Sequence, residues 1–159
     1  MNLVTAAQPS AMNTLRKLHS ATRLGGSGLI LIVGGLDQNG NPLASAELFD
    51  PATGVFTTIA GALNTARYGH AAIVTPGGAV FIIGGQGAGG AYLANVEIFQ
   101  SGSGRPEVTG TFTTASSGLS SARASVAAEI LANGLILVTG GDDSGDAALA
   151  TAEVYSAGI

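Results

Sequence analysis

The sequence predicts an all-β protein made from one structural unit that is repeated three times. A double glycine follows a short apolar run at three places, and a glutamate stands thirteen residues after the first glycine of each pair. The spacing between successive units is 50 and then 56 residues. No segment shows the 3.6-residue apolar period of an amphipathic helix, which indicates that the repeated unit is a group of strands.

Three landmarks define the unit: an arginine, the double glycine and the glutamate. They lie at Arg16, Gly34-Gly35 and Glu47, at Arg67, Gly84-Gly85 and Glu97, and at Arg123, Gly140-Gly141 and Glu153. We therefore expect repeats at about 15–59, 66–114 and 122–159, within one domain that spans residues 1–159. The longer second spacing is assigned to the Gly/Ser-rich segment 101–106, because repeat folds accept insertions in turns.

Each repeat is expected to contain four strands. The first follows the arginine, as in residues 68–74, and the second is the apolar run before the double glycine, as in 29–33. Because this run does not alternate with polar residues, we expect it to be buried on both faces. The third strand carries the glutamate and ends in an aromatic residue, as in 47–49, and the fourth is a short threonine-rich segment, as in 55–59 and 111–114.

This combination of landmarks resembles the kelch repeat. The apolar strand before the double glycine, the Glu-x-aromatic strand with its Asp-Pro-x-Thr-Gly turn (50–54), and the Leu-x-x-x-Arg lead-in (63–67) are most similar to bacterial repeats related to the galactose oxidase propeller. The resemblance implies four-stranded blades of a β-propeller. The family's fourth-strand tryptophan is replaced by Phe56 and Phe112, and the equivalent N-terminal position holds Thr5.

The phase of the chain ends bears on how such a propeller closes. Alignment on the arginines assigns residues 3–7, within the lead-in 1–14, to the fourth strand of a closing blade, whereas the third repeat stops after its third strand. Propellers have about 4–8 blades, so three blades cannot close by themselves. We expect a homodimer that forms a six-bladed ring, in which each N-terminal strand completes the partner's last blade. The alternative is a fragment of a longer propeller.

Composition argues against several classes of partner and site. The net charge is −4 and the six basic residues are scattered, which disfavours nucleic acid as a partner. No apolar run approaches the roughly 20 residues of a membrane helix, and the N-terminus lacks signal-peptide features. We expect a soluble protein, of unknown compartment, without a membrane partner. The absence of cysteine excludes disulfides and thiolate metal sites, and no cofactor or metal site is predicted.

The repeated arginines are the candidate ligand-binding residues. The start of the first strand lies at the same blade edge as the loop after the double glycine, so Arg16, Arg67 and Arg123 should gather at one loop face. The family resemblance implies that arginines at this position recognise peptides or acidic ligands, and a guanidinium group binds carboxylates in a bidentate manner. The alternative is structural: Arg67 pairs with Glu47, and Arg123 with Glu97, and these pairs hold neighbouring strands together.

Other polar groups are expected to be structural. His19 and His70 occupy equivalent positions, but the third repeat has Val126 there, which favours a packing role. The loops that begin at Asp37 and Asp142 place side-chain oxygens at alternate positions, as calcium loops do, but they lack the glycine and distant glutamate of an EF-hand, so we expect solvated turns. The glycine-rich segment 84–90 precedes a strand and lacks a following Gly-Lys-Ser/Thr, which excludes a phosphate loop.

No catalytic motif is visible, so the expected function is a non-enzymatic interaction or scaffold module that binds a protein, peptide or glycan on its loop face. Copper chemistry like that of galactose oxidase needs a cysteine-linked tyrosine, which this chain cannot form. The Glu-x-x-x-Asp-x-x-x-His iron pattern of nitrile-specifier proteins is also absent from the sequence. Two alternatives stay open: a cofactor-free carbohydrate enzyme resembling sialate mutarotases, which would use mouth arginines and a glutamate, and a purely structural assembly unit.

Overall fold

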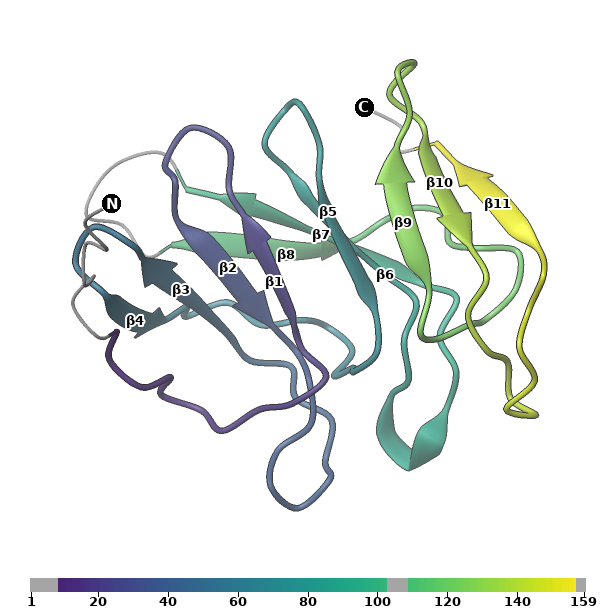
Figure 1. The fold of residues 1–159 in the computed structure, drawn as a ribbon, viewed down its shortest axis with the longest axis horizontal. Coiled ribbons are helices and arrows are strands. Elements are labelled where there is room, and N and C mark those ends of the chain that lie inside the picture. The colour runs from purple at the N-terminus through teal and green to yellow at the C-terminus, as the bar shows by residue number, and fades with distance from the viewer. Residues whose placement is uncertain (1–8, 103–108, 157–159) are drawn as a thin grey trace, which may run out of the picture.

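The computed structural model describes residues 9–102 and 109–156, which form three antiparallel sheets arranged side by side like a fan (Figure 1). We call these sheets blades 1, 2 and 3. Blade 1 contains β1 (Ser20–Arg23), β2 (Ile30–Val33), β3 (Ala46–Asp50) and β4 (Val55–Thr58). Blade 2 contains β5 (Ala71–Val74), β6 (Val80–Ile83), β7 (Val96–Ser101) and β8 (Gly110–Thr114), and blade 3 contains β9 (Ala127–Ile130), β10 (Ile136–Thr139) and β11 (Ala152–Tyr155).

The strands of each blade follow one another in chain order, so that neighbouring strands are joined by short connections. The innermost strands, β1, β5 and β9, contact one another across the two joints between blades. Within the described residues, the only helix is a single 3-10 turn, η1 (Ala88–Gly90), and no helix there could cross a membrane. The prediction of an all-β fold with four-stranded repeat units is confirmed for blades 1 and 2.

The first strand of each repeat is shorter than predicted. In blade 2 it begins at Ala71, whereas Tyr68 makes only an isolated bridge to Gln86. Between them, Gly69 has a left-handed φ of 61° and donates its backbone N–H to the carbonyl of Leu18 in blade 1. The chain therefore turns toward the neighbouring blade before the regular strand begins.

Two apolar clusters fill the joints between blades. At the joint of blades 1 and 2, Leu31 and Val33 of β2 pack with Val80 and Ile82 of β6 and with Phe99 of β7. The cluster at the joint of blades 2 and 3 is built from equivalent positions and includes Phe81, Ile83, Val96, Ile136, Val138 and Tyr155. Both faces of β6 are thus buried, as the unalternating apolar run predicts.

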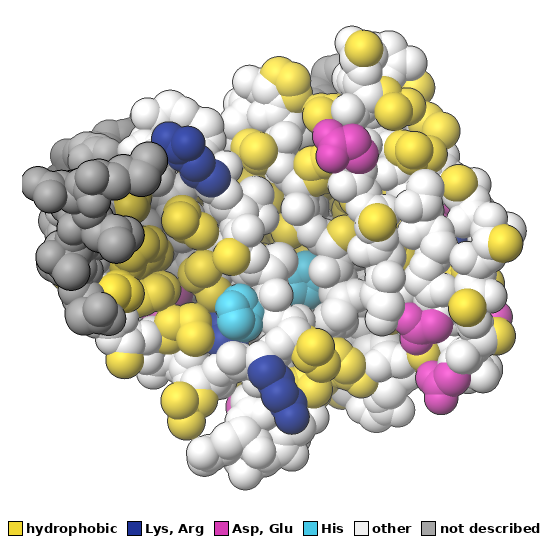
Figure 2. Space-filling view, in the orientation of Figure 1, with side chains coloured by type: hydrophobic (Ala, Val, Ile, Leu, Met, Phe, Trp, Pro, Cys, Tyr) yellow, Lys and Arg dark blue, Asp and Glu magenta, His cyan; other side chains and the backbone are white. Residues whose placement is uncertain are grey.

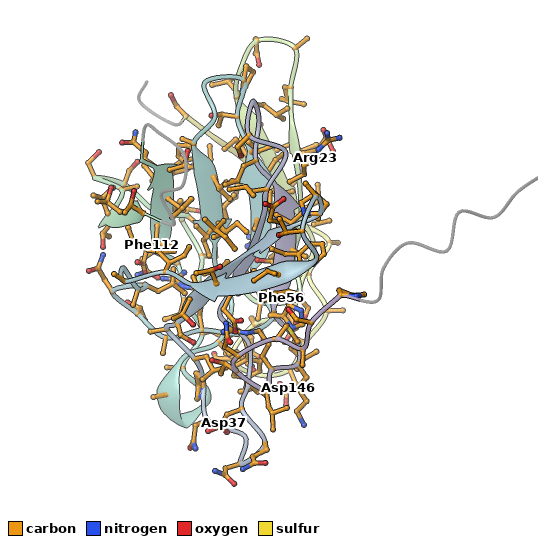
Figure 3. The ribbon with its side chains drawn as sticks, turned by 90° about the vertical axis from the view of Figure 1, so that its left-hand side faces the viewer. Arg23, Asp37, Phe56, Phe112 and Asp146 are labelled. Carbon is orange, nitrogen blue, oxygen red and sulfur yellow. The ribbon has the colours of Figure 1, made fainter. Side chains whose placement is uncertain are left out.

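The aromatic residues that replace the family's tryptophan pack inside their own blades. The ring centroids of Phe49 and Phe56 are 4.6 Å apart, and those of Phe99 and Phe112 are 4.9 Å apart, both in tilted arrangements. The fourth strand is therefore fixed on the third by an aromatic pair across the sheet, of the kind that stabilises antiparallel strands. Figure 3 shows both labelled phenylalanines on the strands of their blades.

Blade 3 has three strands among the described residues, and β11 is its edge. The residues predicted to complete such a blade, 3–7, lie outside the described residues. The face of β11 that points away from blade 2 is open. Val154 is 57% exposed, whereas Leu48, at the same register position in blade 1, is 3% exposed. An apolar surface that blade 1 buries is therefore uncovered at the far end of the fan.

The double glycines are required because another segment of backbone passes very close to them. The second glycine of each pair has a φ between 89° and 98°, which L-residues rarely adopt. A Cβ on Gly85 would lie 2.7 Å from the carbonyl oxygen of Tyr68 and 3.0 Å from the Cβ of His70. The loop after β6 can therefore pass beside the segment before β5 only when this position has no side chain.

We expect Gly85→Ala to destabilise the protein. The left-handed backbone alone costs about 1–2 kcal/mol for a residue with a Cβ, and the overlap with Tyr68 adds to this cost. Urea unfolding followed by circular dichroism measures the change in the free energy of unfolding. Gly25→Ala is the matched control, because no atom lies within 4 Å of its Cβ and its φ is not positive, and it should unfold like the wild type. Equal loss in the two variants would contradict the argument.

Candidate functional site

The three arginines lie at the blade edge that carries the loops after the double glycines, as predicted. Isolated bridges pair the residue that follows each arginine with the residue that follows each double glycine: Lys17 with Leu36, Tyr68 with Gln86, and Ala124 with Asp142. The three loops extend from the lower edge of the fan in Figure 1. Figure 3 shows Asp37 and Asp146, from two of these loops, at one end of the molecule and Arg23 at the other. We call this edge the loop edge.

Each arginine side chain is enclosed by its own blade. Arg67 Nη1 donates to the carbonyl oxygens of Gly84 at 2.9 Å and Asn95 at 3.1 Å, and Nη2 donates to Glu97 Oε1 at 2.6 Å. Both side chains of this ion pair are fully buried. The same pattern recurs in the other blades, where Arg16 binds Gly34, Ser45 and Glu47, and Arg123 binds Gly140, Thr151 and Glu153.

The expected pairing of Arg67 with Glu47 and of Arg123 with Glu97 is wrong. Arg67 pairs with Glu97 and Arg123 with Glu153, within one blade in each case. The reason is that the backbone of the arginine contacts one blade and its side chain extends into the next. The backbone N–H of Arg67 donates to Leu43 of blade 1, and its carbonyl accepts from Gly35, while the guanidinium group extends into blade 2. The arginine therefore joins two blades, through its backbone on one side and its ion pair on the other.

The glutamate also fixes the lead-in segment. Glu97 accepts hydrogen bonds from the backbone N–H of Asn64 at 2.6 Å and Thr65 at 2.9 Å. Glu47 and Glu153 bind the equivalent backbone groups in their repeats. Burial alone would raise the pKa of Glu47, but the N–H of Asn13 and the guanidinium group of Arg16 outweigh it and lower the pKa. The pKa of Glu153 is lowered by a similar balance.

The guanidinium groups of the predicted ligand site are already occupied by ion pairs. The side chains of Arg16 and Arg67 are 0% exposed, and that of Arg123 is 2% exposed. A carboxylate ligand could reach these guanidinium groups only by replacing the paired glutamates. Binding of a ligand by the arginines stays a prediction, and the geometry gives them a structural role in all three blades.

His70 lies at the joint of blades 1 and 2. His70 Nε2 lies 2.8 Å from Ser20 Oγ of blade 1, and its Nδ1 is buried without a partner among the described residues. Burial lowers the pKa of His70 to about 3, and the charges of Arg67 and His19 act in the same direction. Burial also lowers the pKa of His19. The two imidazole groups are visible near the centre of the face shown in Figure 2.

The acidic loops use their carboxylates internally. Asp37 Oδ1 accepts the backbone N–H groups of Asn39 and Asn41, both at 2.8 Å, and its Oδ2 accepts the side-chain amide of Asn41 at 3.0 Å. The amide of Asn41 is the main cause of a lowered pKa for Asp37. The sequence predicted a solvated turn here, and the structure shows an exposed turn whose carboxylate is bonded to its own loop.

A link between two loops was not foreseen from the sequence. Tyr92 Oη lies 2.6 Å from Asp142 Oδ2 and 2.8 Å from Asp146 Oδ1, so the phenol connects blade 2 to the loop of blade 3. The hydrogen bond to Asp142 is the main cause of a raised pKa for Tyr92. The signal in the sequence is that the equivalent bridge positions hold Pro42 and Ala148, so the tyrosine is the exceptional residue.

We expect Arg67→Ala to lower the free energy of unfolding by about 3–5 kcal/mol, because it leaves Glu97 as an uncompensated buried charge. Urea titration with circular dichroism measures this change. Arg23→Ala, which removes an exposed arginine outside the ion pairs, is the matched control and should be nearly neutral. A wild-type unfolding curve for Arg67→Ala would reject the structural role and favour the predicted ligand site.

Stability should fall as the pH is lowered, in two steps. The unfolded chain protonates His70 near pH 6.5 while the folded protein keeps it neutral to about pH 3, so stability is full above 6.5 and declines toward 3. The slope is at most about 1.4 kcal/mol per pH unit. Glu47 and Glu153 stabilise the fold above pH 4.5, and this contribution is lost as the pH falls through their lowered folded pKa values.

The first of these steps can be separated by a substitution. His70→Gln keeps a polar group opposite Ser20 but does not titrate, so the free energy of unfolding should change less between pH 6.5 and 5 than it does in the wild type. Urea titrations at several pH values measure this difference. The decline below pH 4.5 should persist in the variant. An unchanged slope between pH 6.5 and 5 would show that His70 is not the group responsible.

Comparison with known proteins agrees with the repeat pattern. Residues 18–61 match the family model described as the kelch motif, and this range contains the four strands of blade 1. No curated protein matches the chain. Blades 2 and 3 carry the same double glycine and the same arginine–glutamate pair at equivalent positions. Residues 18–61 thus carry a kelch motif, and blades 2 and 3 repeat its landmarks.

Proposed function

We propose that this chain is a non-enzymatic interaction module that presents its loop edge to a protein, peptide or glycan. The observation that carries the proposal is that the three loops after the double glycines share one backbone frame but differ in their exposed side chains. The frame includes one hydrogen bond that closes each loop, at nearly the same length: Asp37 N–H to Asn41 at 3.0 Å, Gly87 N–H to Ala91 at 2.8 Å, and Asp143 N–H to Ala147 at 3.2 Å.

The side chains on this frame differ in chemistry from blade to blade. The first loop exposes amides at Gln38, Asn39 and Asn41, the second is glycine-rich and carries the partly buried Tyr92, and the third is acidic. In Figure 2, acidic side chains gather at the lower right, over the loop between β10 and β11. A rigid edge with varied polar groups suits recognition of an extended surface, because fixed loops on a repeat scaffold require little ordering on binding.

The alternative of a cofactor-free carbohydrate enzyme has less support. That reading requires arginines and a glutamate that are free to contact a sugar at the mouth. Each arginine here is held by a glutamate and two carbonyl groups, and the Arg67–Glu97 pair is fully buried. The non-enzymatic reading needs no rearrangement of these pairs.

We further propose that a second copy of the chain completes the three blades to a six-bladed ring. The open face of blade 3 and the exposed Val154 support this part of the proposal, because a soluble protein rarely leaves the joint face of a blade uncovered. Fourth-strand completion by the partner's residues 3–7 belongs to the same proposal. A closed ring would also cover the edge strand β11.

A random peptide library displayed on phage tests the interaction function. Peptides selected on the wild type should bind the double variant Asn39→Ala, Ser144→Ala at least about tenfold more weakly, a loss of about 1.4 kcal/mol. Fluorescence anisotropy measures the dissociation constants. Neither side chain has a hydrogen-bond partner of its own in the described residues, so the fold should be unchanged.

Arg23→Ala is the control, because Arg23 lies at the opposite end of the molecule (Figure 3), and it should bind the peptides like the wild type. A library that yields no binder, or peptides whose affinity does not depend on the loop edge, would contradict the proposed function.

A further inference from the structure

The two joints inside the chain are sealed by the same four backbone hydrogen bonds. At the first joint, Gly35 N–H donates to Arg67, and Arg67 N–H donates to Leu43. Leu63 N–H donates to Ala44, and Gly69 N–H donates to Leu18. The second joint repeats the pattern one blade later, with bonds from Gly85 to Arg123, Arg123 to Leu93, Leu119 to Ala94, and Ser125 to Gly69.

Each joint therefore has two chemically different sides. The side that belongs to the earlier blade supplies three carbonyl acceptors and one N–H donor. The side that belongs to the later blade supplies three N–H donors and one carbonyl acceptor. Two sides of the same kind could not pair. Two later-blade sides would mainly bring donors to donors, and two earlier-blade sides would mainly bring acceptors to acceptors.

Within residues 9–102 and 109–156, the same groups are unpaired at the two ends of the fan. Blade 3 has the earlier-blade set, whose members make no hydrogen bond through these atoms among the described residues: the carbonyls of Ser125, Leu149 and Ala150 and the N–H of Gly141. Blade 1 has the later-blade set, equally unpaired in the described part of the chain: the N–H groups of Met12, Arg16 and Leu18 and the carbonyl of Arg16. We call these two surfaces the tail and the head.

The head and the tail also have complementary apolar faces beside these hydrogen-bonding groups. On the head, Ile30 is partly exposed, although Val80 and Ile136 at the same register position are fully buried in the joints. On the tail, Val154 is 57% exposed, whereas Leu48 is almost fully buried. Each end thus exposes the apolar position that an internal joint covers.

We propose that the occupant of the tail is the head of a second copy of this chain. This inference rests on the self-association proposed above, and it specifies the contact: the backbone N–H of Arg16 donates to Leu149 of the partner copy, and the carbonyl of Arg16 accepts from Gly141 of the partner copy. The contact is head to tail, because two heads or two tails would oppose like groups. A ring of two chains uses the contact twice and leaves no end free.

Light scattering on two blocked variants tests the contact. Val154→Glu places a charge on the tail, and Ile30→Glu places one on the head. The wild type should have about twice the 15.5 kDa chain mass, and each blocked variant should have the mass of one chain. An equimolar mixture of the two variants should regain a two-chain mass, because one unblocked head and one unblocked tail remain.

Circular dichroism and the Val55→Glu variant control for folding. Val55 is 47% exposed on the outer strand β4, and its side chain points to the opposite face of the strand from Phe56, which packs on the head side with Phe49. This variant should keep the wild-type mass. All variants should keep the wild-type spectrum, and a blocked variant that unfolds is replaced by Val154→Lys or Ile30→Lys.

The outcomes separate this inference from the proposals on which it rests. A monomeric wild type overturns both self-association and the head-to-tail contact, while peptide binding at the loop edge could still stand. A two-chain mass that survives in either blocked variant leaves self-association intact and overturns the head-to-tail contact, as does a mixture that stays monomeric at several hundred micromolar. A larger assembly that either block abolishes supports the contact and contradicts the six-bladed ring.

Discussion

The buried pair of an arginine and a glutamate is the interaction on which each blade depends. A guanidinium group and a carboxylate removed from water are stable only when nearly every polar atom has a partner. The blades meet this requirement by using the carbonyls next to the double glycine and the backbone N–H groups of the lead-in. Strands two and three, the loop and the lead-in are thereby fixed by one network, and the repeated sequence landmarks are its members.

The fold was predictable because the repeat occurs three times in one chain. A single double glycine would have had little meaning, but equal spacings to Glu47, Glu97 and Glu153 indicate that these residues serve the same structural purpose. The partner of each arginine was not predictable in the same way. Because every repeat contains both an arginine and a glutamate, the sequence alone does not show whether Arg67 pairs with Glu47 before it or with Glu97 after it. The direction of the Arg67 side chain decides for Glu97.

The candidate site shows a similar division. Its place at the loop edge follows from strand order, which the apolar pattern predicts. Burial of the guanidinium groups does not follow, because a residue at the mouth of a blade can point outward or into the sheet. The link from Tyr92 to Asp142 was not predicted, since it joins residues 50 positions apart and the equivalent bridge positions of the other blades hold Pro42 and Ala148. Repetition reveals what blades share, and features unique to one blade require coordinates.

In blade 1, the arginine's ion pair within the blade can be distinguished from its backbone bonds to a neighbouring blade. Arg16 makes its ion pair with Glu47 although no described blade precedes it, so the pair forms within one blade and does not depend on a neighbour. The joints are formed by a separate set of backbone hydrogen bonds and apolar contacts, and each blade has groups for such a joint on both of its faces. Stability in such an array is approximately a sum of blade and joint terms. Because the terms are separate, a change on the outer face of a terminal blade can alter assembly without disturbing the blade that carries it.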